Sequence, residues 1–238
     1  MRNRLLCTCP SRGRPELLER MVESFYKTRS ENVDLVIYLD KDDPKLKEYK
    51  LREGFNVNTV IRDRMNVAQI HNQIVFDNPG YGFYMPINDD ITFISNEWDA
   101  ILIEAIEEKG AGWGIAFCDD STGNHRHNLP TFGAMSVNII NAIGHLYPLE
   151  LRILYGDNFM FDLGRAIGRL FYCPKAIVNH QPPGVANSAF VPGDRRLSPT
   201  LVKEDNLAYK KYIDTKLDSD VQKIFEAIIN EKNLVGVK

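Results

Sequence analysis

The sequence predicts a single α/β domain in which a mostly parallel central sheet carries helices on both faces. Over residues 4–118, short apolar runs alternate with segments whose apolar residues recur at helical spacing. The run 33–39 is apolar almost throughout, which is typical of a strand buried on both faces. The chain has 238 residues, enough for one sizeable core and short for two independent domains.

The first half supplies the regular elements. Strands are expected at 4–9, 33–39, 58–61, 83–87 and 114–118. Pro15 suits the first position of a helix that follows the turn 10–15. Asn66 and Gln69 can form a capping box at the start of a second helix, and Asn96 can cap a third, which ends at Gly110. Pro86 is unusual in a strand because it cannot donate a hydrogen bond to the ladder.

The second half is less regular. A polar loop is expected at 119–131, followed by a helix at 136–143 that Gly144 closes. Asp157 can cap another helix, closed by Gly168. The remaining expected elements are short strands at 170–173 and 177–179, a Pro- and Gly-rich mobile loop at 182–199, and amphipathic helices at 205–213 and 219–230.

Composition narrows the classes of function. Hydrophobic residues make up 44% and charged residues 26%, as in soluble globular proteins. No stretch approaches the ~20 apolar residues that span a membrane, and no signal peptide opens the chain, so we expect a cytoplasmic protein. The net charge of −3 argues against strong non-specific binding of nucleic acid. The four cysteines form no CxxC motif and are expected to be buried thiols in a reducing compartment.

The segment Asn88-Asp89-Asp90 follows an expected strand and is the strongest local motif. Adjacent carboxylates at the mouth of a sheet suit hard cations such as Mg²⁺ or Mn²⁺, although two Asp residues can also cap a turn. His180 ends a later apolar run, and its imidazole could complete a Mn²⁺ site or serve a structural hydrogen bond.

Three further polar segments have two readings each. Asp157 can cap its helix or act as a general base, and both can be true. The turn Ser11 to Arg14 could hold phosphate at a helix N-terminus, but it has neither Walker A nor G-x-G-x-x-G spacing. Asp119/Asp120 with His125/His127 form either a solvated loop or part of a substrate cleft.

The order of these motifs resembles that of GT-A glycosyltransferases, in particular the family 2-like group, over about residues 5–180. The opening Pro10 to Arg14 is similar to the family's first strand-turn, and Asp40 to the acid that ends its second strand. Segment 64–72 is similar to the one whose Asn faces the donor, and segment 88–90 to the DxD motif, with Asn in place of the first acid. Gly156-Asp157 resembles the Glu-Asp motif without its Glu, and His180 matches a late metal-binding His.

The resemblance implies a GT-A (Rossmann-like) fold and a metal-dependent, inverting transfer of a sugar from a nucleotide-diphosphate sugar, a UDP-sugar first, to an acceptor hydroxyl. Asp157 is the implied base. Mn²⁺ or Mg²⁺ is expected on Asp90 and His180, with Asp89 nearby. The implied donor-binding residues are Pro10, Ser11, Arg12, Arg14, Asp40, Arg64, Asn72, Asn88 and Asp89. The resemblance divides the chain into a nucleotide-sugar half (1–95), an acceptor half (96–180), and a mobile loop with C-terminal helices (181–238). Arg195 and Arg196 of the mobile loop could close over the phosphates.

Several segments also resemble small GT-A-like proteins that tailed phages often encode. They are Ser-Arg-Gly-Arg-Pro at 11–15, Leu-Pro-Thr at 129–131, segment 155–164 and Val-Asn-His at 178–180. This resemblance implies an enzyme of the host cytoplasm that acts on a phage-made or host-made acceptor. Hydroxymethylated pyrimidine in phage DNA is one such acceptor, with Arg126/His127 and Arg195/Arg196 as candidate contacts. A polysaccharide or a small molecule is the alternative acceptor. A nucleotidyltransferase and a non-catalytic sugar-binding module are the alternative functions.

Overall fold

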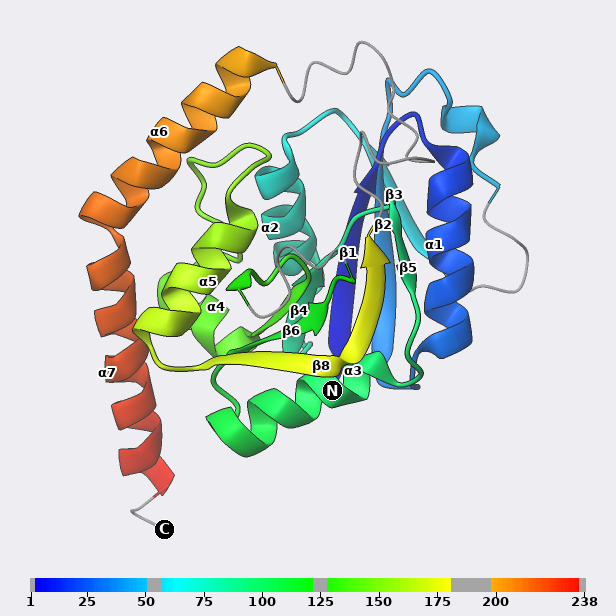
Figure 1. Ribbon diagram of the computed structural model, residues 1–238. Coiled ribbons are helices and arrows are strands. Elements are labelled where there is room, and N and C mark those ends of the chain that lie inside the picture. The colour runs from blue at the N-terminus through cyan, green and yellow to red at the C-terminus, as the bar shows by residue number, and fades with distance from the viewer. Residues whose placement is uncertain (1–2, 51–56, 122–127, 181–197, 236–238) are drawn as a thin grey trace.

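The computed structural model describes residues 3–50, 57–121, 128–180 and 198–235, and its central sheet has eight strands. The strands are β1 (Leu5–Ser11), β2 (Val33–Asp40), β3 (Asn58–Arg62), β4 (Phe83–Pro86), β5 (Ile91–Phe93), β6 (Ile115–Asp119), β7 (Gly133–Ser136) and β8 (Leu170–His180). Their order in the sheet is β3-β2-β1-β4-β7-β6-β8-β5. Figure 1 shows the parallel neighbours β1 and β2 beside helix α1.

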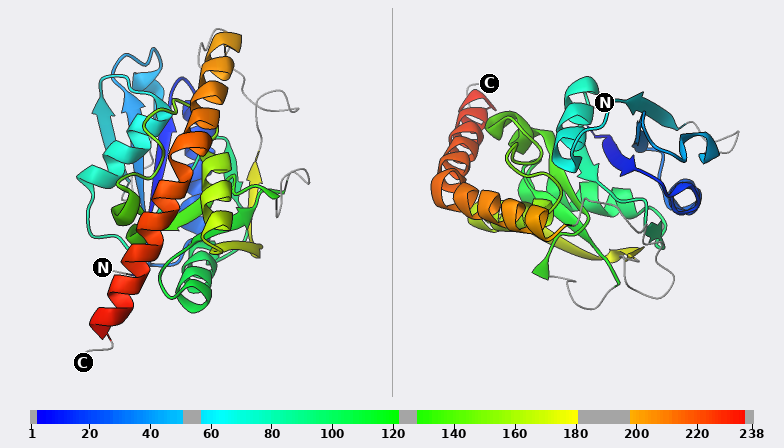
Figure 2. Two further views of the ribbon diagram at one scale, coloured as in Figure 1. Left: turned by 90° about the vertical axis from the view of Figure 1, so that its left-hand side faces the viewer. Right: turned by 90° about the horizontal axis from the view of Figure 1, so that it is seen from above.

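Helices cover both faces of this sheet, as the sequence predicts. They are α1 (Pro15–Thr28), α2 (Val67–Asp77), α3 (Trp98–Glu104), α4 (Val137–Ile143), α5 (Gly156–Ala166), α6 (Pro199–Thr215) and α7 (Leu217–Val235). A 3₁₀ turn (Leu46–Glu48) follows β2, and a π-helical turn (Ala105–Lys109) continues α3. One apolar core lies between the sheet and α1 with α3, and the other lies under α2, α4 and α5. Figure 2 shows α6 and α7 outside α4 and α5.

The sheet is mixed rather than uniformly parallel. Strands β3, β2, β1 and β4 are parallel neighbours, and β6 is parallel to β8. Strand β7 runs antiparallel to both β4 and β6, and β5 runs antiparallel to β8. The sequence analysis does not predict β5 and β7, because these strands of three and four residues show neither a period-2 pattern nor an extended apolar run like the one at 83–87.

Strand β8 replaces the two short strands that the sequence predicts. Its first part pairs with β6 and its last part with β5. The pairing with β6 shifts between Cys118↔Cys173 and Asp119↔Ile177. Pro174 lies in this irregularity, where a missing backbone N–H does not interrupt the ladder. Pro86 is likewise tolerated, because it is the last residue of β4.

Local signals at helix starts succeed at two helices and fail at two. Pro15 is the first residue of α1, as expected. The Asn66–Gln69 capping box is present at α2, with both of its hydrogen bonds. Asn96 does not cap α3, which follows Glu97 in the left-handed region at φ 53°. The expectation that Asp157 caps α5 is wrong as well, because the cap position is Tyr155 at φ 68° and Asp157 lies inside the first turn.

The C-terminal helices are longer than the amphipathic pattern indicates. Helix α6 begins at Pro199, with Ser198 as its N-cap, so the end of the expected 182–199 loop is helical. Residues 182–197 of that loop, with Arg195 and Arg196, lie outside the described part of the chain. Within the described residues, no helix is both long enough and apolar enough to cross a membrane.

Candidate functional site

The carboxyl ends of β1, β2 and β4 bring the predicted polar residues to one edge of the sheet. Ser11 ends β1, Asp40 ends β2, and segment 88–90 follows β4. The parallel registers Ser11↔Leu39 and Thr8↔Pro86 align these ends. Ligands of open α/β sheets bind at this edge, so the topology places the sequence-predicted residues where a site is expected.

Asp89 and Asp90 lie next to residues of the first strand-turn. Asp89 is completely buried and accepts a hydrogen bond of 2.5 Å from Ser11 Oγ. The Arg14 guanidinium reaches Asp89 Oδ1 at 2.6 Å and Asp90 Oδ2 at 3.5 Å. Arg14 thus balances the charge of two adjacent buried carboxylates, a pairing that nothing in the local sequence indicates.

The antiparallel pairing of β5 with β8 brings His180 to Asp90. Ile91 is the register partner of His180, and His180 Nε2 lies 3.6 Å from Asp90 Oδ1. Burial raises the pKa of Asp90, and the charge of Arg14 opposes this rise. Asp90 Oδ1 is buried and makes no hydrogen bond within the described residues.

These two side chains fit part of a divalent-metal site. Two neighbouring ligands of one Mg²⁺ ion lie about 3 Å apart, close to the observed separation of Asp90 and His180. A carboxylate oxygen with an imidazole nitrogen is a donor set that Mn²⁺ accepts. The part of the chain that the structure describes contains no group of three or more such ligands. Substrate oxygens or water would therefore have to complete the coordination.

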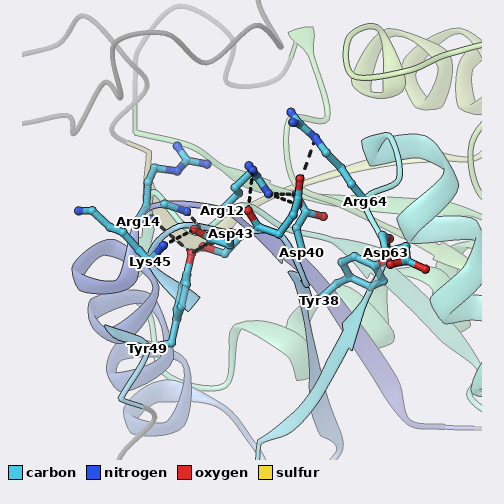
Figure 3. A network of polar contacts seen from close by, with 12 residues as sticks. Arg12, Arg14, Tyr38, Asp40, Asp43, Lys45, Tyr49, Asp63 and Arg64 are labelled. Carbon is cyan, nitrogen blue, oxygen red and sulfur yellow. Dashed lines mark hydrogen bonds and ion pairs between the residues drawn. The ribbon is translucent and has the colours of Figure 1, made fainter. Parts of the chain in front are cut away.

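Arg12 and its neighbours form a second polar network at the end of β2 (Figure 3). Arg12 Nη1 donates to Asp40 Oδ2 at 3.1 Å and to Asp42 Oδ1 at 2.5 Å. Arg64 Nε lies 4.0 Å from the same Asp40 oxygen. Burial raises the pKa of Asp40, whereas the hydrogen bond and charge of Arg12 lower it.

Asp43 holds the strand-turn in place, a role that the sequence analysis missed. Its carboxylate accepts hydrogen bonds from Gly13 N at 2.7 Å and from the Tyr49 hydroxyl at 2.9 Å. Gly13 has φ 70°, a conformation that glycine adopts without steric cost. Tyr49 also accepts from Arg14 N at 3.3 Å (Figure 3). The acidic turn 40–43 can be recognised in the sequence. The sequence does not distinguish a carboxylate that supports the loop from one that faces a ligand.

A cavity of about 320 Å³ opens beside this network. Its lining includes four of the predicted donor-binding residues: Pro10, Ser11, Asp40 and Arg64. Tyr38 of β2 and four further residues of the predicted donor-facing segment 64–72 also line it: Met65, Asn66, Val67 and Ile70. The sequence analysis did not single out the remaining three residues, which come from the loop before α5 and from helix α6: Arg152, Ile153 and Leu201. The cavity thus joins segments from both ends of the chain.

Asn72 does not take part in this cluster. Its side-chain oxygen accepts from Leu146 N at 2.8 Å and from Tyr147 N at 3.1 Å, and its amide donates to Tyr147 O at 2.8 Å. We therefore leave Asn72 out of the candidate site, because its polar atoms fasten the loop that carries Tyr147. Asn88, by contrast, is exposed next to Asp89.

Asp157 lies in the first turn of α5, where its Oδ1 accepts from Asn158 N at 2.9 Å. Gly156 precedes it, and a Cβ there would lie 2.7 Å from the Tyr147 ring. The Tyr147 loop, fastened by Asn72, therefore packs against the start of α5. Asp157 is half-buried, and no capping hydrogen bond from its side chain holds it at the start of α5.

The acidic pair of the central loop has structural partners. Asp119 accepts from the Tyr172 hydroxyl at 2.7 Å, and Asp120 accepts from Thr131 Oγ1 at 3.1 Å. These contacts join the ends of the loop to β8 and to the segment before β7. The other predicted members of this cluster, His125 to His127, lie outside the described residues.

Comparison with solved structures identifies the fold as that of GT-A glycosyltransferases. A mannosyltransferase of Pyrobaculum calidifontis, in complex with GDP-Man and Mn²⁺, matches with a TM-score of 0.60 and 11% identity, over 97% of this chain and 75% of the other. S. aureus TarS 1–349 in complex with UDP-GlcNAc matches with a TM-score of 0.59 and 14% identity, over 94% of this chain and 71% of the other. A further TarS 1–349 structure matches with a TM-score of 0.52 and 13% identity, over 75% of this chain and 60% of the other.

No protein-family model matches the chain, and a search of curated proteins finds no significant match. The identities to the solved structures are low, so this likeness concerns the fold. Relation to phage proteins is a hypothesis that rests on the sequence motifs alone.

Proposed function

We propose that the protein is a metal-dependent, inverting glycosyltransferase that uses a nucleotide-diphosphate sugar. One observation carries the proposal: the sheet edge brings the buried Asp90 carboxylate to His180, 3.6 Å apart. The cavity beside the end of β2 supports it. So does the fold, because structures of similar fold hold GDP-Man with Mn²⁺ or UDP-GlcNAc.

The donor nucleotide would occupy the cavity at the ends of β1 and β2. In this proposal Asp40 accepts hydrogen bonds from the base, and Arg12 holds the Asp40 carboxylate toward it. Arg64 lines the same cavity and offers its positive charge to the donor. Pro10 and Ser11 form the wall at the end of β1.

The diphosphate would lie near the acidic pair. Arg14 already balances Asp89 and Asp90 and could donate to phosphate oxygens, and the exposed Asn88 would meet the ribose. Asp89, which the sequence also predicts as a donor contact, is completely buried and would instead hold Ser11 and Arg14 in place. Asp90 and His180 would hold Mn²⁺ or Mg²⁺, and burial leaves Asp89 out of this pair. When bound, such an ion would supply Lewis-acid stabilisation of the diphosphate leaving group.

Asp157 is the proposed general base. Its carboxylate would accept the proton of the acceptor hydroxyl, while the hydroxyl oxygen forms a bond to the anomeric carbon. The bond between that carbon and the donor phosphate breaks, and the nucleoside diphosphate leaves with the bonding electrons. Attack from the face opposite the leaving group inverts the configuration.

The acceptor we propose is a hydroxymethylated pyrimidine in DNA, which follows from the phage-like motifs and not from charge. The net charge of −3 means that any contacts with phosphates must come from local basic residues. A base in a duplex would also have to be flipped out to reach Asp157. A polysaccharide or small-molecule hydroxyl is the alternative acceptor.

A donor screen followed by a transfer assay tests the proposal. UDP-, GDP- and other nucleotide sugars are first screened by thermal shift with Mn²⁺. Transfer is then measured on hydroxymethylated DNA and on oligosaccharides. We expect release of nucleoside diphosphate, and a UDP-sugar as the donor. Release of pyrophosphate from a nucleoside triphosphate would indicate a nucleotidyltransferase instead, and donor binding without hydrolysis or transfer would indicate a sugar-binding module.

A further inference from the structure

We infer that helix α6 is part of the donor site: its buried Asp205 positions the cavity wall formed by Arg152 and Ile153, and its next turn positions the start of α5. This inference rests on the proposed function, because it assigns the cavity to the donor. It concerns residues of the C-terminal helices, none of which the sequence motifs connect with a site.

The Asp205 carboxylate ties α6 to the loop before α5. It is 1% exposed and accepts three backbone hydrogen bonds, from Arg152 N at 3.2 Å, Ile153 N at 2.9 Å and Leu154 N at 2.8 Å. Hydrogen bonds from backbone N–H groups to a carboxylate are stronger than those between neutral groups. The other side of this loop is held by α2, because Arg152 O accepts from Ala68 N at 3.1 Å.

This fastened loop forms a wall of the cavity. Arg152 and Ile153 both line it, and so does Leu201, which lies one helical turn before Asp205 on α6. Glu204 adds an exposed ion pair to Arg152 at 2.7 Å, a contact that solvent weakens. The position of the wall therefore depends mainly on the buried carboxylate.

The next turn of α6 holds the residue at the N-terminal end of α5. Asn206 Nδ2 donates to the Tyr155 hydroxyl at 2.6 Å, and the rings of Tyr155 and Tyr209 stack with centroids 5.1 Å apart. Tyr155 adopts the left-handed conformation at φ 68°, which is unfavourable for a residue with a side chain and needs support from its surroundings. Asp157 follows two residues later, so α6 supports both the cavity wall and the proposed base.

Replacing Asp205 removes the support for the wall and leaves backbone N–H groups of the loop without their acceptor. In Asp205→Asn, the amide keeps one acceptor oxygen and faces the same backbone donors with its NH₂ group. We expect the affinity for UDP or GDP to fall roughly tenfold or more, because a displacement of about 1 Å in the wall of a binding site moves its groups out of contact with the ligand. Asp214→Asn is the matched control, since Asp214 is exposed on the same helix.

The experiment combines nucleotide binding with hydrogen exchange on the full chain. UDP and GDP affinities are measured by calorimetry with Mn²⁺, and exchange is followed at the amides of 152–154. Asp205→Asn should lose affinity and exchange faster at these amides, with an unchanged far-UV circular dichroism spectrum, whereas Asp214→Asn should match the wild type. Unchanged nucleotide affinity in a folded Asp205→Asn would overturn the inference while leaving the donor site in place.

Asn206→Ala provides a second variant should Asp205→Asn not fold. It removes only the hydrogen bond to Tyr155, so we expect kcat to fall while the KM for the donor stays near that of the wild type. Equal losses of kcat in Asn206→Ala and Asp214→Asn, or no loss in either, would contradict the positioning role of α6. A wild-type chain that binds neither UDP nor GDP would instead overturn the proposed function, and the inference with it.

Discussion

At the scale of single residues, Asp157 gives the sharpest test of the chemistry. Its side chain does not cap α5, so Asp157→Asn should cost little stability, at most the roughly 0.3–1 kcal/mol that a first-turn carboxylate gains from the helix dipole. As the proposed base, it should contribute on the order of 10²–10⁴-fold to the rate of transfer. We expect Asp157→Asn to keep donor and metal binding and to lose nearly all transfer, as measured by product formation and by calorimetry.

Asp218→Asn is the control for this variant, because Asp218 is an exposed acid in the first turn of α7. Both variants should then show similar small changes in melting temperature. Normal transfer by Asp157→Asn would remove Asp157 from the mechanism. Retention of configuration at the anomeric carbon would point to a mechanism that needs no such base.

The proposed metal pair is also testable one residue at a time. Asp90→Asn and His180→Ala should each weaken Mn²⁺ binding in the presence of nucleoside diphosphate by roughly tenfold or more. The first removes the negative charge of a protein ligand, and the second removes a ligand altogether. Electron paramagnetic resonance of Mn²⁺ measures this directly. Asn179→Ala is the control, since neighbouring side chains of a strand point to opposite faces. Full activity in EDTA, or a wild-type Mn²⁺ response in His180→Ala, would refute the assignment.

At the scale of elements, a buried histidine joins α2 to β1. His71 Nδ1 and Thr8 Oγ1 lie 2.6 Å apart and share a hydrogen bond. Burial lowers the pKa of His71 to about 3, so the folded chain keeps it neutral while the unfolded chain takes up a proton below about pH 6.5. The contribution of neutral His71 to the free energy of unfolding is therefore complete above about pH 6.5. It is lost progressively as the pH falls toward 3.

We expect His71 to account for a loss of about 2 kcal/mol in the free energy of unfolding between pH 7 and pH 5. His71→Asn keeps a polar atom near Nδ1 but does not titrate in this range, so its stability should fall less over the same interval. Urea unfolding of both proteins at the two pH values measures the difference. Equal pH dependence would show that His71 is already protonated, or accessible to protons, in the folded chain.

At the scale of the whole molecule, the cysteines report on global unfolding. All four are free and buried, in strands of the sheet. Burial raises the pKa values of Cys7, Cys9 and Cys118 well above the ordinary value, and that of Cys173 to about 11. Because the thiolate is the reactive form, native thiols should react with Ellman's reagent on the order of 10³-fold more slowly than unfolded ones.

Addition of a reductant should leave the melting temperature unchanged, since the fold contains no disulfide among these residues. Rapid labelling of even one thiol in the native protein, without loss of structure, would show local opening of the sheet that the packed core does not indicate.

The arrangement of elements could be predicted wherever the signal is local. The alternation of apolar runs and helical stripes predicted the strands β1 to β4 and β6, the helices between them and the two-sided sheet, because burial of each face requires that pattern. The capping box at Asn66 was predictable for the same reason, since its partner is three residues away. The short strands β5 and β7 and the conformations of Glu97 and Tyr155 were not, because tertiary packing determines them.

The sequence by itself determined the fold class, the edge of the sheet where a site is expected, and the residues Asp40, Asp89, Asp90 and His180 as candidates. Only the tertiary structure decided that Arg14 pairs with both acids, that Asn72 fastens the Tyr147 loop, and that Asp205 of α6 holds the cavity wall. The reason is distance along the chain. Arg14 and Asp90 are separated by 76 positions, and Asp205 and Arg152 by 53. Contacts between residues so far apart in the sequence depend on how helices and strands pack against one another. A local pattern of residues does not predict that packing.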